Sequence, residues 1–395
     1  MLSFCNVKCY FVAKSIQLSI NSLIHYFTIM KKSLLLFLAA LTFSFSAQAT
    51  VVNIDPSSEG NLRRGIRDKV QAGDTLVLAD GEYDESQSVT MNKEGLVIMA
   101  AEGAKPVIKA KSYMKHYATT TIIGIKFDGG GTAEHGCYSY ENTNKSLTLI
   151  DCEIGNYAQY LITAASDAHI DSLTIEGCLL HDCGDAAVYM TNTDKLPDNL
   201  PICSYFKMTN STVYNINGTQ YYGVIDIREN KSAYGAGGTE VIVDHVTLYN
   251  YKNPQGGFYI YKSPKLTITN TIVANPTEGP AAFYIYGGTV DNSLYFNGSA
   301  DSRATYTNCI DNQNPLFVDA DNGDFALAKG SPALGAGTDG SNLGDPRWNA
   351  PAPEGPTTAL ENIAVEGKAV KTIINGQLII IKNGVQYNAL GQVIK

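Results

Sequence analysis

The chain is poor in the features on which nucleic-acid-binding and metal-binding proteins depend. It carries 29 Lys and Arg against 38 Asp and Glu, which gives a formal net charge of −9. Binding to a phosphate backbone needs a basic face, so this balance argues against nucleic acid as a partner. The absence of a Cys-x-x-Cys pair argues against a zinc ribbon. The glycine-rich stretches 235–238 and 335–337 lack the lysine of a phosphate-binding loop.

Long apolar runs are also scarce, and the clearest one lies near the N-terminus. A charged start at Met30 is followed by the apolar residues 34–41 and by a small-residue cleavage site that ends at Ala49. This arrangement predicts a secretory signal peptide over residues 30–49, with residues 1–29 a misassigned extension. The apolar run is too short to span a bilayer, so we expect no transmembrane segment in the mature chain. The predicted location is secreted or cell-surface.

What the sequence does contain is a repeat. Six segments follow one template and begin at Ile122, Leu147, Leu173, Phe206, Val241 and Leu266. One site of the template is filled by Gly124, Asp151, Gly177, Asn210, Asp244 and Asn270, at spacings of 27, 26, 33, 34 and 26 residues. Gly, Asn and Asp tolerate bends, so this site predicts a corner. A period of this size indicates a solenoid, and parallel crossovers are right-handed. The predicted fold is therefore an all-β, right-handed parallel β-helix over residues 50–349.

Six cysteines follow the predicted signal peptide: Cys137, Cys152, Cys178, Cys183, Cys203 and Cys309. Export permits disulfides, so their state is open from the sequence. Cys152 and Cys178 occupy equivalent places in consecutive repeats, 26 residues apart. We favour thiols stacked in the core of the coil over a bridge between these two residues.

Three aligned segments between Tyr222 and Tyr286 carry the most functional information. Each has two apolar residues separated by one other: Ile225/Ile227, Phe258/Ile260 and Phe283/Ile285. Alternate side chains of a strand point to opposite faces, so these pairs are predicted to point inward. The residues between and after them then form two outward columns. The first column is Asp226, Tyr259 and Tyr284, and the second is Arg228, Tyr261 and Tyr286.

The outward tyrosines predict a sugar-binding wall. Tyr189 falls in the first column one coil earlier, and Tyr221 and Tyr222 come just before the strand. Aromatic rings contact sugars through apolar surface, and the tyrosine hydroxyl adds a hydrogen bond. The alternative is that these rings only shield the sheet. Asp226 and Arg228 lie two residues apart. The alternative to a functional role is that they form an ion pair in solvent, which contributes little to stability.

The two ends of the predicted coil differ from its middle. Leu62, Ile66 and Val70 have helical spacing and predict a short N-terminal cap helix. Repeats are lost near 314–337, which predicts a terminal cap. Residues 350–358 are Pro-rich and predict a linker. Residues 359–395 predict a small β module with an Asn-Gly hairpin turn. Its last eight residues resemble the C-terminal sorting modules of Bacteroidetes secreted proteins, which implies export machinery as a partner.

The stretch Gly73-Asp-Thr to Leu78-Ala-Asp-Gly-Glu-Tyr83 resembles the opening of secreted β-helix proteins of polysaccharide lyase family 6, the chondroitinase-B-like and alginate-lyase-like proteins. The resemblance implies cleavage of uronic-acid polymers by β-elimination. That reaction needs a base and a group that neutralises the substrate carboxylate. In the family a Lys is the base, an Arg assists, and calcium held by acidic residues binds the carboxylate.

The family pattern carries over at some positions only. Lys231 falls at the place of the base, and Asp226 at the second acidic position, where the resemblance implies a calcium ligand. Val224 stands at the first acidic position, which departs from the family. Lys262 is the cation nearest to the place of the family Arg, and Arg228 is a second candidate for the assisting role.

Two further classes of function stay open beside a polysaccharide lyase. A glycan-binding protein would use the tyrosine wall without turnover. A structural or adhesion β-helix would use neither the wall nor the lysines. The predicted partner of the first two classes is an extracellular polysaccharide, with polymers that contain uronic acid as one candidate.

Overall fold

The computed structural model describes most of residues 49–349 and three short C-terminal strands. Within 49–349 the exceptions are residues 58–59, 112, 141–144, 166, 192–195, 197–199, 229–237, 262, 264, 276 and 278; the C-terminal segments are 370–374, 377–382 and 385–387. The predicted signal peptide, the Pro-rich linker, Lys231 and Lys262 therefore lie outside the described residues.

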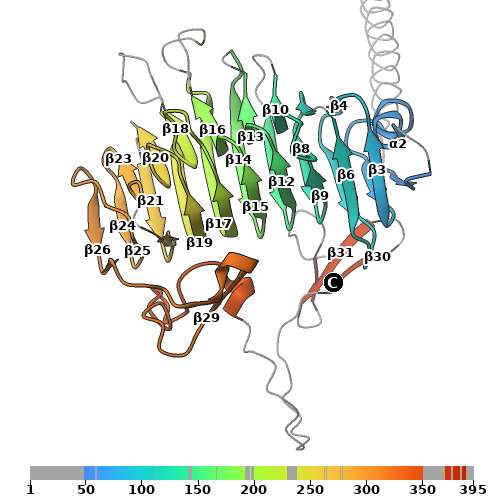
Figure 1. Cartoon of the computed structure of the whole chain (residues 1–395). Coiled ribbons are helices and arrows are strands. Elements are labelled where there is room, and N and C mark those ends of the chain that lie inside the picture. Colours follow the sequence, from blue (N-terminus) through green and yellow to red (C-terminus); the bar gives the residue numbers. More distant parts are fainter. Residues whose placement is uncertain are drawn as a thin grey trace, which may run out of the picture. The chain divides into compact units, whose positions relative to one another are not determined.

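The fold is a right-handed parallel β-helix, as predicted (Figure 1). Most coils contribute one strand to each of three parallel sheets, and the last two coils have no strand in the third. The first sheet contains β1 (Val51–Ile54), β2 (Thr75–Leu78), β5 (Leu96–Ala100), β8 (Thr120–Ile123), β11 (Ser146–Ile150), β14 (Ile170–Glu176), β21 (Lys265–Thr269), β24 (Thr289–Asp291) and β26 (Thr305–Thr307). The second contains β3 (Gly81–Glu85), β6 (Pro106–Ala110), β9 (Lys126–Asp128), β12 (Glu153–Tyr157), β15 (Leu179–Cys183), β22 (Ile272–Ala274), β25 (Leu294–Phe296) and β27 (Ile310–Asp311).

Two long strands, β17 (Cys203–Ile216) and β19 (Glu240–Tyr251), run through both of these sheets. The third sheet has eight strands and carries the predicted tyrosine wall. It contains β4 (Val89–Met91), β7 (Met114–His116), β10 (His135–Ser139), β13 (Tyr160–Ala164), β16 (Ala186–Thr191), β18 (Ile225–Arg228), β20 (Phe258–Tyr261) and β23 (Phe283–Ile285).

Left-handed residues turn the chain from the first sheet into the second. Asp151, Asn210 and Asn270 have φ angles of 52°, 51° and 51°, in the region that Asn and Asp tolerate better than other residues. One predicted corner residue is wrong. The pairing of β17 with β19 puts Asp244 opposite Thr209, the residue before the corner residue Asn210. The corner is His245 instead, with φ 52°, and its ring nitrogens bond to the Asp244 carboxylate and to a serine hydroxyl.

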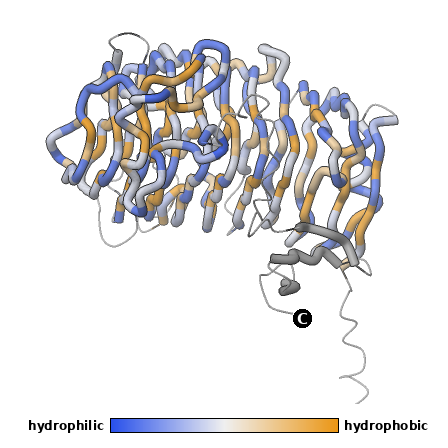
Figure 2. Tube along the Cα trace, turned by 90° about the horizontal axis from the view of Figure 1, so that it is seen from below, coloured by the Kyte–Doolittle hydropathy of each residue, from blue (hydrophilic) through white to orange (hydrophobic). Residues whose placement is uncertain are grey.

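Alternate side chains of each strand point inward, and together they fill the inside of the coil. Figure 2 shows hydrophobic and hydrophilic residues alternating along the strands. Phe258 and Phe283 are fully buried and stack on each other, with ring centroids 5.8 Å apart and an interplanar angle of 14°. The six cysteines after the predicted signal peptide all have free thiols. Cys152 and Cys178 are buried in consecutive coils, so the prediction of stacked thiols is confirmed.

The N-terminal end of the core is covered by a short helix, as predicted. α2 (Asn61–Arg64) continues into the π-helical turn η1 (Gly65–Lys69). Leu62, Ile66 and Val70 are at most 1% exposed, because their helical spacing turns all three toward the first coil. Within the residues that the structure describes, no helix has the length and apolar character to cross a membrane.

The segment after the last coil folds back over the outside of the second sheet. It contains β28 (Phe317–Asp319), η2 (Ala320–Asn322), β29 (Asp324–Leu327) and η3 (Pro346–Asn349). Figure 1 shows it beside β19. We expected a cap across the end of the coil. Instead, Arg347 donates to the Cys178 carbonyl at 2.7 Å, and Trp348 donates to Thr212 at 2.8 Å. We call residues 313–349 the return segment.

The C-terminal strands form an antiparallel sheet of β30 (Val370–Ile374), β31 (Gln377–Lys382) and β32 (Val385–Tyr387). The pairing of Lys382 with Val385 confirms the predicted hairpin. β30 was not predicted. The sorting role of residues 359–395 stays a prediction.

Candidate functional site

The outer surface of the third sheet carries both predicted columns. The pairing of β16, β18, β20 and β23 aligns Tyr189, Asp226, Tyr259 and Tyr284 in one row. The next row pairs Arg228 with Tyr261, and Tyr286 follows β23 beside Tyr261. We call the outward tyrosines of this sheet the aromatic face. Its members are Tyr113, Tyr138, Tyr140, Tyr160, Tyr189, Tyr222, Tyr259, Tyr261, Tyr284 and Tyr286.

In the middle of the aromatic face the rings stack along the coil axis. His135 and Tyr160 have centroids 5.3 Å apart at 20°, and Tyr160 and Tyr189 have centroids 4.8 Å apart at 9°. Rings stacked one coil apart cover each other's faces, so they expose mainly edges and hydroxyls. Here the shielding alternative describes the rings better than sugar stacking does. His135 and Tyr160 were missed from the sequence, although Tyr160 lies one coil before the predicted wall.

Beyond Tyr189 the ring geometry changes to edge-to-face. Tyr222 meets Tyr189 at 61°. Tyr259 meets Tyr284 at 63°, and the rings of Tyr261 and Tyr286 are nearly perpendicular, at 89° and 4.4 Å. Rings set at such angles leave faces as well as edges at the surface. The part of the aromatic face on β20 and β23 is therefore the better surface for a sugar. Tyr221, beside Tyr222, is 74% exposed.

Asp226 and Arg228 form a buried ion pair beneath the tyrosines. The Arg228 Nε donates to Asp226 Oδ1 at 2.6 Å, and the Gly223 N–H donates to Asp226 Oδ2 at 2.9 Å. The Asp226 side chain is 0% exposed, and that of Arg228 is 14% exposed. The alternative of a pair in solvent is therefore wrong. Because it is covered, the Asp226 carboxylate does not reach a glycan, and its part is to position Arg228.

Three tyrosines from three different coils surround the Arg228 guanidinium. Its Cζ lies 4.8 Å from the ring centroid of Tyr259, 5.9 Å from that of Tyr189 and 6.0 Å from that of Tyr222. These distances are within the range of cation–π attraction. The cation therefore fixes the positions of rings that neighbour one another only because the coils are in register.

Burial also changes the acidity of this pair. It raises the pKa of the Asp226 carboxyl to about 6, although the Arg228 guanidinium and the Gly223 N–H oppose the shift. The ordinary value is 3.8. Between the two values the folded protein holds a proton that the unfolded chain releases. The stability that this group contributes is complete below pH 3.8 and is lost as the pH rises through 6.

The Asp226→Asn substitution tests this dependence of stability on pH, because an asparagine side chain does not bind or release a proton in this range. We expect the unfolding free energy of the protein, relative to the variant, to fall by about 2 kcal/mol between pH 4 and pH 7. Urea unfolding of both proteins at several pH values measures the difference. A difference that stays constant or grows toward neutral pH would contradict a raised pKa.

A second Asp-x-Arg pair lies beside Tyr284 and Tyr286, at the β23 end of the aromatic face. Arg303 Nε donates to Asp301 Oδ1 at 2.7 Å, and a second guanidinium nitrogen bonds to Asp301 Oδ2. The Arg303 Cζ lies 3.3 Å from the ring centroid of Tyr286 and 5.0 Å from that of Tyr284. The Arg303 side chain is 40% exposed, unlike that of Arg228. This pair was missed, although it has the same spacing in the sequence as Asp226 and Arg228.

The residues around Asp226 do not fit a calcium ion. Calcium takes six to eight oxygen ligands, whereas both Asp226 oxygens are occupied by Arg228 and Gly223. Val224 is buried in the core and has no side-chain oxygen. Among the described residues, no group of three His, Cys, Asp or Glu side chains is placed to hold a metal.

The structure brings together eight of the predicted site residues. The predicted base, Lys231, lies outside the described residues. Those brought together are Tyr189, Tyr222, Asp226, Arg228, Tyr259, Tyr261, Tyr284 and Tyr286. Tyr221 lies beside them in the chain. The catalytic roles of Lys231 and Lys262 stay predictions, because both residues lie outside the described part of the chain.

Comparison with known proteins gives structural likenesses alone. No protein-family model matches the chain, and no curated protein matches it. The alginate lyase AlyGC of polysaccharide lyase family 6 aligns with a TM-score of 0.47 and 14% identity, over 66% of this chain and 37% of that one. Pectate lyase Pel9A aligns with a TM-score of 0.37 and 13% identity, over 75% and 95%. ORF18 of Geobacillus virus E2 aligns at 0.34 and 14%, over 66% and 60%.

This chain therefore spans well under half the length of AlyGC. At these identities and scores the alignments say nothing about what the chain binds. The class that its own coordinates define is a right-handed parallel β-helix whose third sheet bears an aromatic outer face.

Proposed function

We propose that the aromatic face binds an extracellular polysaccharide. The observation that carries the proposal is a group of four partly exposed tyrosines, on β20, on β23 and just after β23, that lies between two Asp-x-Arg pairs. These tyrosines are Tyr259, Tyr261, Tyr284 and Tyr286. Their rings supply apolar contact and their hydroxyls supply hydrogen bonds, which is the combination that a sugar residue needs.

The spacing of the coils suits a linear glycan that lies along the coil axis. Neighbouring strands of a sheet are about 4.8 Å apart, which is close to the length of one pyranose in a polymer. Successive sugars can then meet Tyr261 on β20 and Tyr286 beyond β23, with Arg303 at the end of the row. Since the rings are held by Arg228, Arg303 and one another, little side-chain entropy is lost on binding.

Cleavage by β-elimination on the same face is the second candidate. The observation that favours it is the fixed Arg228 cation beside the tyrosine rings, since such a cation can neutralise a uronate carboxylate. In this candidate Lys231 takes the proton, and Lys262 or Arg228 assists. Secretion through the predicted signal peptide and C-terminal module belongs to both candidates.

Gel retardation with alginate, pectin and chondroitin tests the binding proposal. We expect at least one polymer to retard the protein, and Tyr261→Ala together with Tyr286→Ala to weaken retardation about tenfold or more. Tyr205→Ala is the matched control, because Tyr205 is a half-exposed tyrosine of the first sheet. Equal weakening by the control, or no retardation by any polymer, would contradict the proposal.

The same polymers separate binding from cleavage. A lyase leaves unsaturated uronate, whose absorbance rises with time, and Lys231→Ala would abolish that rise. A flat absorbance trace together with retardation identifies binding without turnover. If the absorbance stays flat and no polymer retards the protein, a structural or adhesion role is the class of function that remains.

A further inference from the structure

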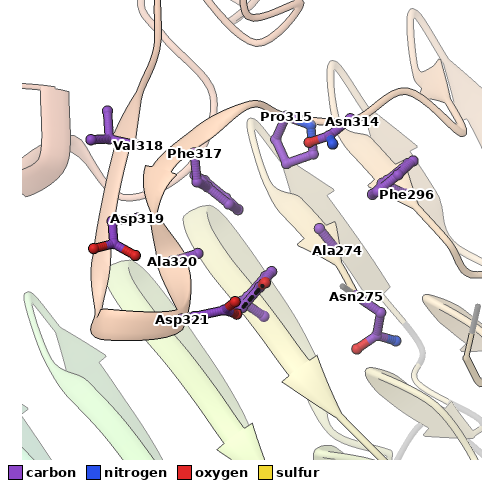
Figure 3. A pocket seen from close by; sticks show the side chains of 11 residues that line it. Ala274, Asn275, Phe296, Asn314, Pro315, Phe317, Val318, Asp319, Ala320 and Asp321 are labelled. Carbon is purple, nitrogen blue, oxygen red and sulfur yellow. Dashed lines mark hydrogen bonds between the residues drawn. The ribbon is translucent and has the colours of Figure 1, made fainter. Parts of the chain in front are cut away.

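The outer side of the second sheet is packed shut beneath the return segment. Ala274, shown in Figure 3, is 0% exposed and lies in one apolar cluster with Phe325 and Leu343. The ring of Tyr249 is covered by the rings of Phe317 and Phe325, with centroids 5.8 Å and 5.7 Å away. These contacts hold the return segment against the coil.

An open hollow of about 380 Å³ lies at the N-terminal end of the coil, between the helical turns α2 and η1 and the strand β4. Its lining consists of three cations, two hydroxyls and two amides, and no carboxylate of the described residues lines it. Every lining residue is exposed or half-exposed, so the hollow is open to solvent. The volume is within the range for small-molecule sites.

The three cations come from two elements that face each other. Arg63 and Arg67 lie four residues apart on α2 and η1, each directly after a buried residue, Leu62 and Ile66. Residues at this spacing are neighbours on one side of a helix. Lys93 comes from the turn between β4 and β5. Like charges gathered in this way repel one another, so an anion between them would relieve a cost that the fold carries.

The carboxylates closest to these cations are engaged elsewhere. Asp68 accepts from Arg67 Nε and from one of its terminal nitrogens, both at 2.7 Å, at the exposed surface. Glu85 is 0% exposed, and one of its oxygens accepts from the backbone N–H groups of Leu62 and Arg63. The Arg63 Nε is buried and has no hydrogen-bond partner among the described residues. A buried donor without a partner is costly, and an oxyanion beside Arg63 would supply the acceptor.

β4 brings neutral donors to the same hollow. Ser88, Thr90 and Asn92 alternate with the buried residues Val89 and Met91, so their side chains lie on the outer side of the strand. Hydroxyl and amide groups donate hydrogen bonds to the oxygens of an anion, and cations strengthen such bonds. The hollow therefore has the chemistry of an oxyanion site.

We propose that this hollow binds a phosphate monoester carried by a small molecule. A phosphate monoester has nearly two negative charges at pH 7 or above, whereas a sulfate ester or a carboxylate has one, so three cations favour the phosphate. Arg63, Arg67 and Lys93 hold the charge, and the Thr90 hydroxyl donates to a phosphate oxygen. Thr90 lies six strand spacings, about 29 Å, from Tyr259. The site therefore does not rest on the function proposed for the aromatic face.

Calorimetric titration of the full chain at pH 8 and fixed ionic strength tests the site. The probes are inorganic phosphate, glucose 6-phosphate, glucose 6-sulfate and glucuronate. We expect inorganic phosphate and glucose 6-phosphate to bind, and the sulfate ester and the carboxylate to bind at least tenfold more weakly. Binding of glucose 6-phosphate should also weaken as salt is added, because the cations are exposed to solvent.

Substitutions then locate the binding. Lys93→Gln and Arg67→Gln should each weaken the binding of glucose 6-phosphate about tenfold, and Thr90→Val several-fold. Lys93→Gln should unfold at the same or a higher temperature, because it relieves repulsion. Lys207→Gln is the matched control, since Lys207 is a half-exposed lysine at an outward position of β17.

Three results would each overturn the proposal. The first is that glucose 6-phosphate does not bind the wild-type protein. The second is that glucose 6-sulfate or glucuronate binds as tightly as glucose 6-phosphate. The third is that Lys93→Gln weakens binding no more than Lys207→Gln does.

Discussion

Replacement of Arg228 by Gln is expected to lower the free energy of unfolding by about 3–5 kcal/mol near pH 8. The Asp226 side chain is 0% exposed, so without the guanidinium its negative charge would have no partner in the folded protein. Gln can donate a hydrogen bond but cannot supply the missing charge. Urea unfolding followed by circular dichroism measures the loss.

The loss should also shrink on acidification. Without the guanidinium, which lowers the pKa of Asp226, burial raises that pKa further. Protonation below this value removes the unpaired charge, so Arg228→Gln should approach the wild-type stability near pH 5. A loss that is the same at pH 5 and pH 8 would mean that Arg228 acts through packing and not through its charge.

The chain contains a matched control for this prediction. Arg303 makes the same kind of pair with Asp301, but its side chain is 40% exposed. Solvent-exposed ion pairs contribute about 0–1 kcal/mol. Arg303→Gln should therefore have little effect on stability. Equal losses for the two variants would contradict the difference in burial between the two ion pairs.

Replacement of Phe283 by Ala is the second change with a large expected effect, a loss of about 3–5 kcal/mol. Phe283 is fully buried and stacks on Phe258, so its removal leaves a cavity in a core that neighbouring coils share. The next residue, Tyr284, points outward, and Tyr284→Ala should cost less than about 1 kcal/mol. Thermal and urea unfolding of the two variants measure both values.

The contrast between these neighbours tests the alternation directly. If Tyr284→Ala were the more damaging change, the strand would present the opposite face to the core. The outward column would then be wrong throughout, because a shift of one residue moves every side chain of a strand to the other face.

The architecture could be predicted because it repeats. A corner residue every 25 to 35 positions and an apolar pair in each coil determine which side chains face outward. Tyr259, Tyr261 and Tyr284 were therefore placed correctly from the sequence alone. The one wrong corner, Asp244, comes after the long insertion between β18 and β19, where the period of the repeat changes.

Features that depend on contacts between coils could not be predicted in the same way. Asp226 has an outward position in its own strand, yet it is fully buried, with Tyr189 and Tyr259 of the adjoining coils as its strand neighbours. Arg303 follows the last strand of the third sheet, where the template no longer applies.

The most direct test of the proposed glycan-binding surface is hydroxyl-radical footprinting of the full chain, with and without the polymer that retards it in gels. Oxidation of Tyr259, Tyr261, Tyr284 and Tyr286 should fall several-fold in the presence of the polymer, while that of Tyr205 stays constant. Protection confined to other surfaces, with these four tyrosines as reactive as in the free protein, would contradict the account.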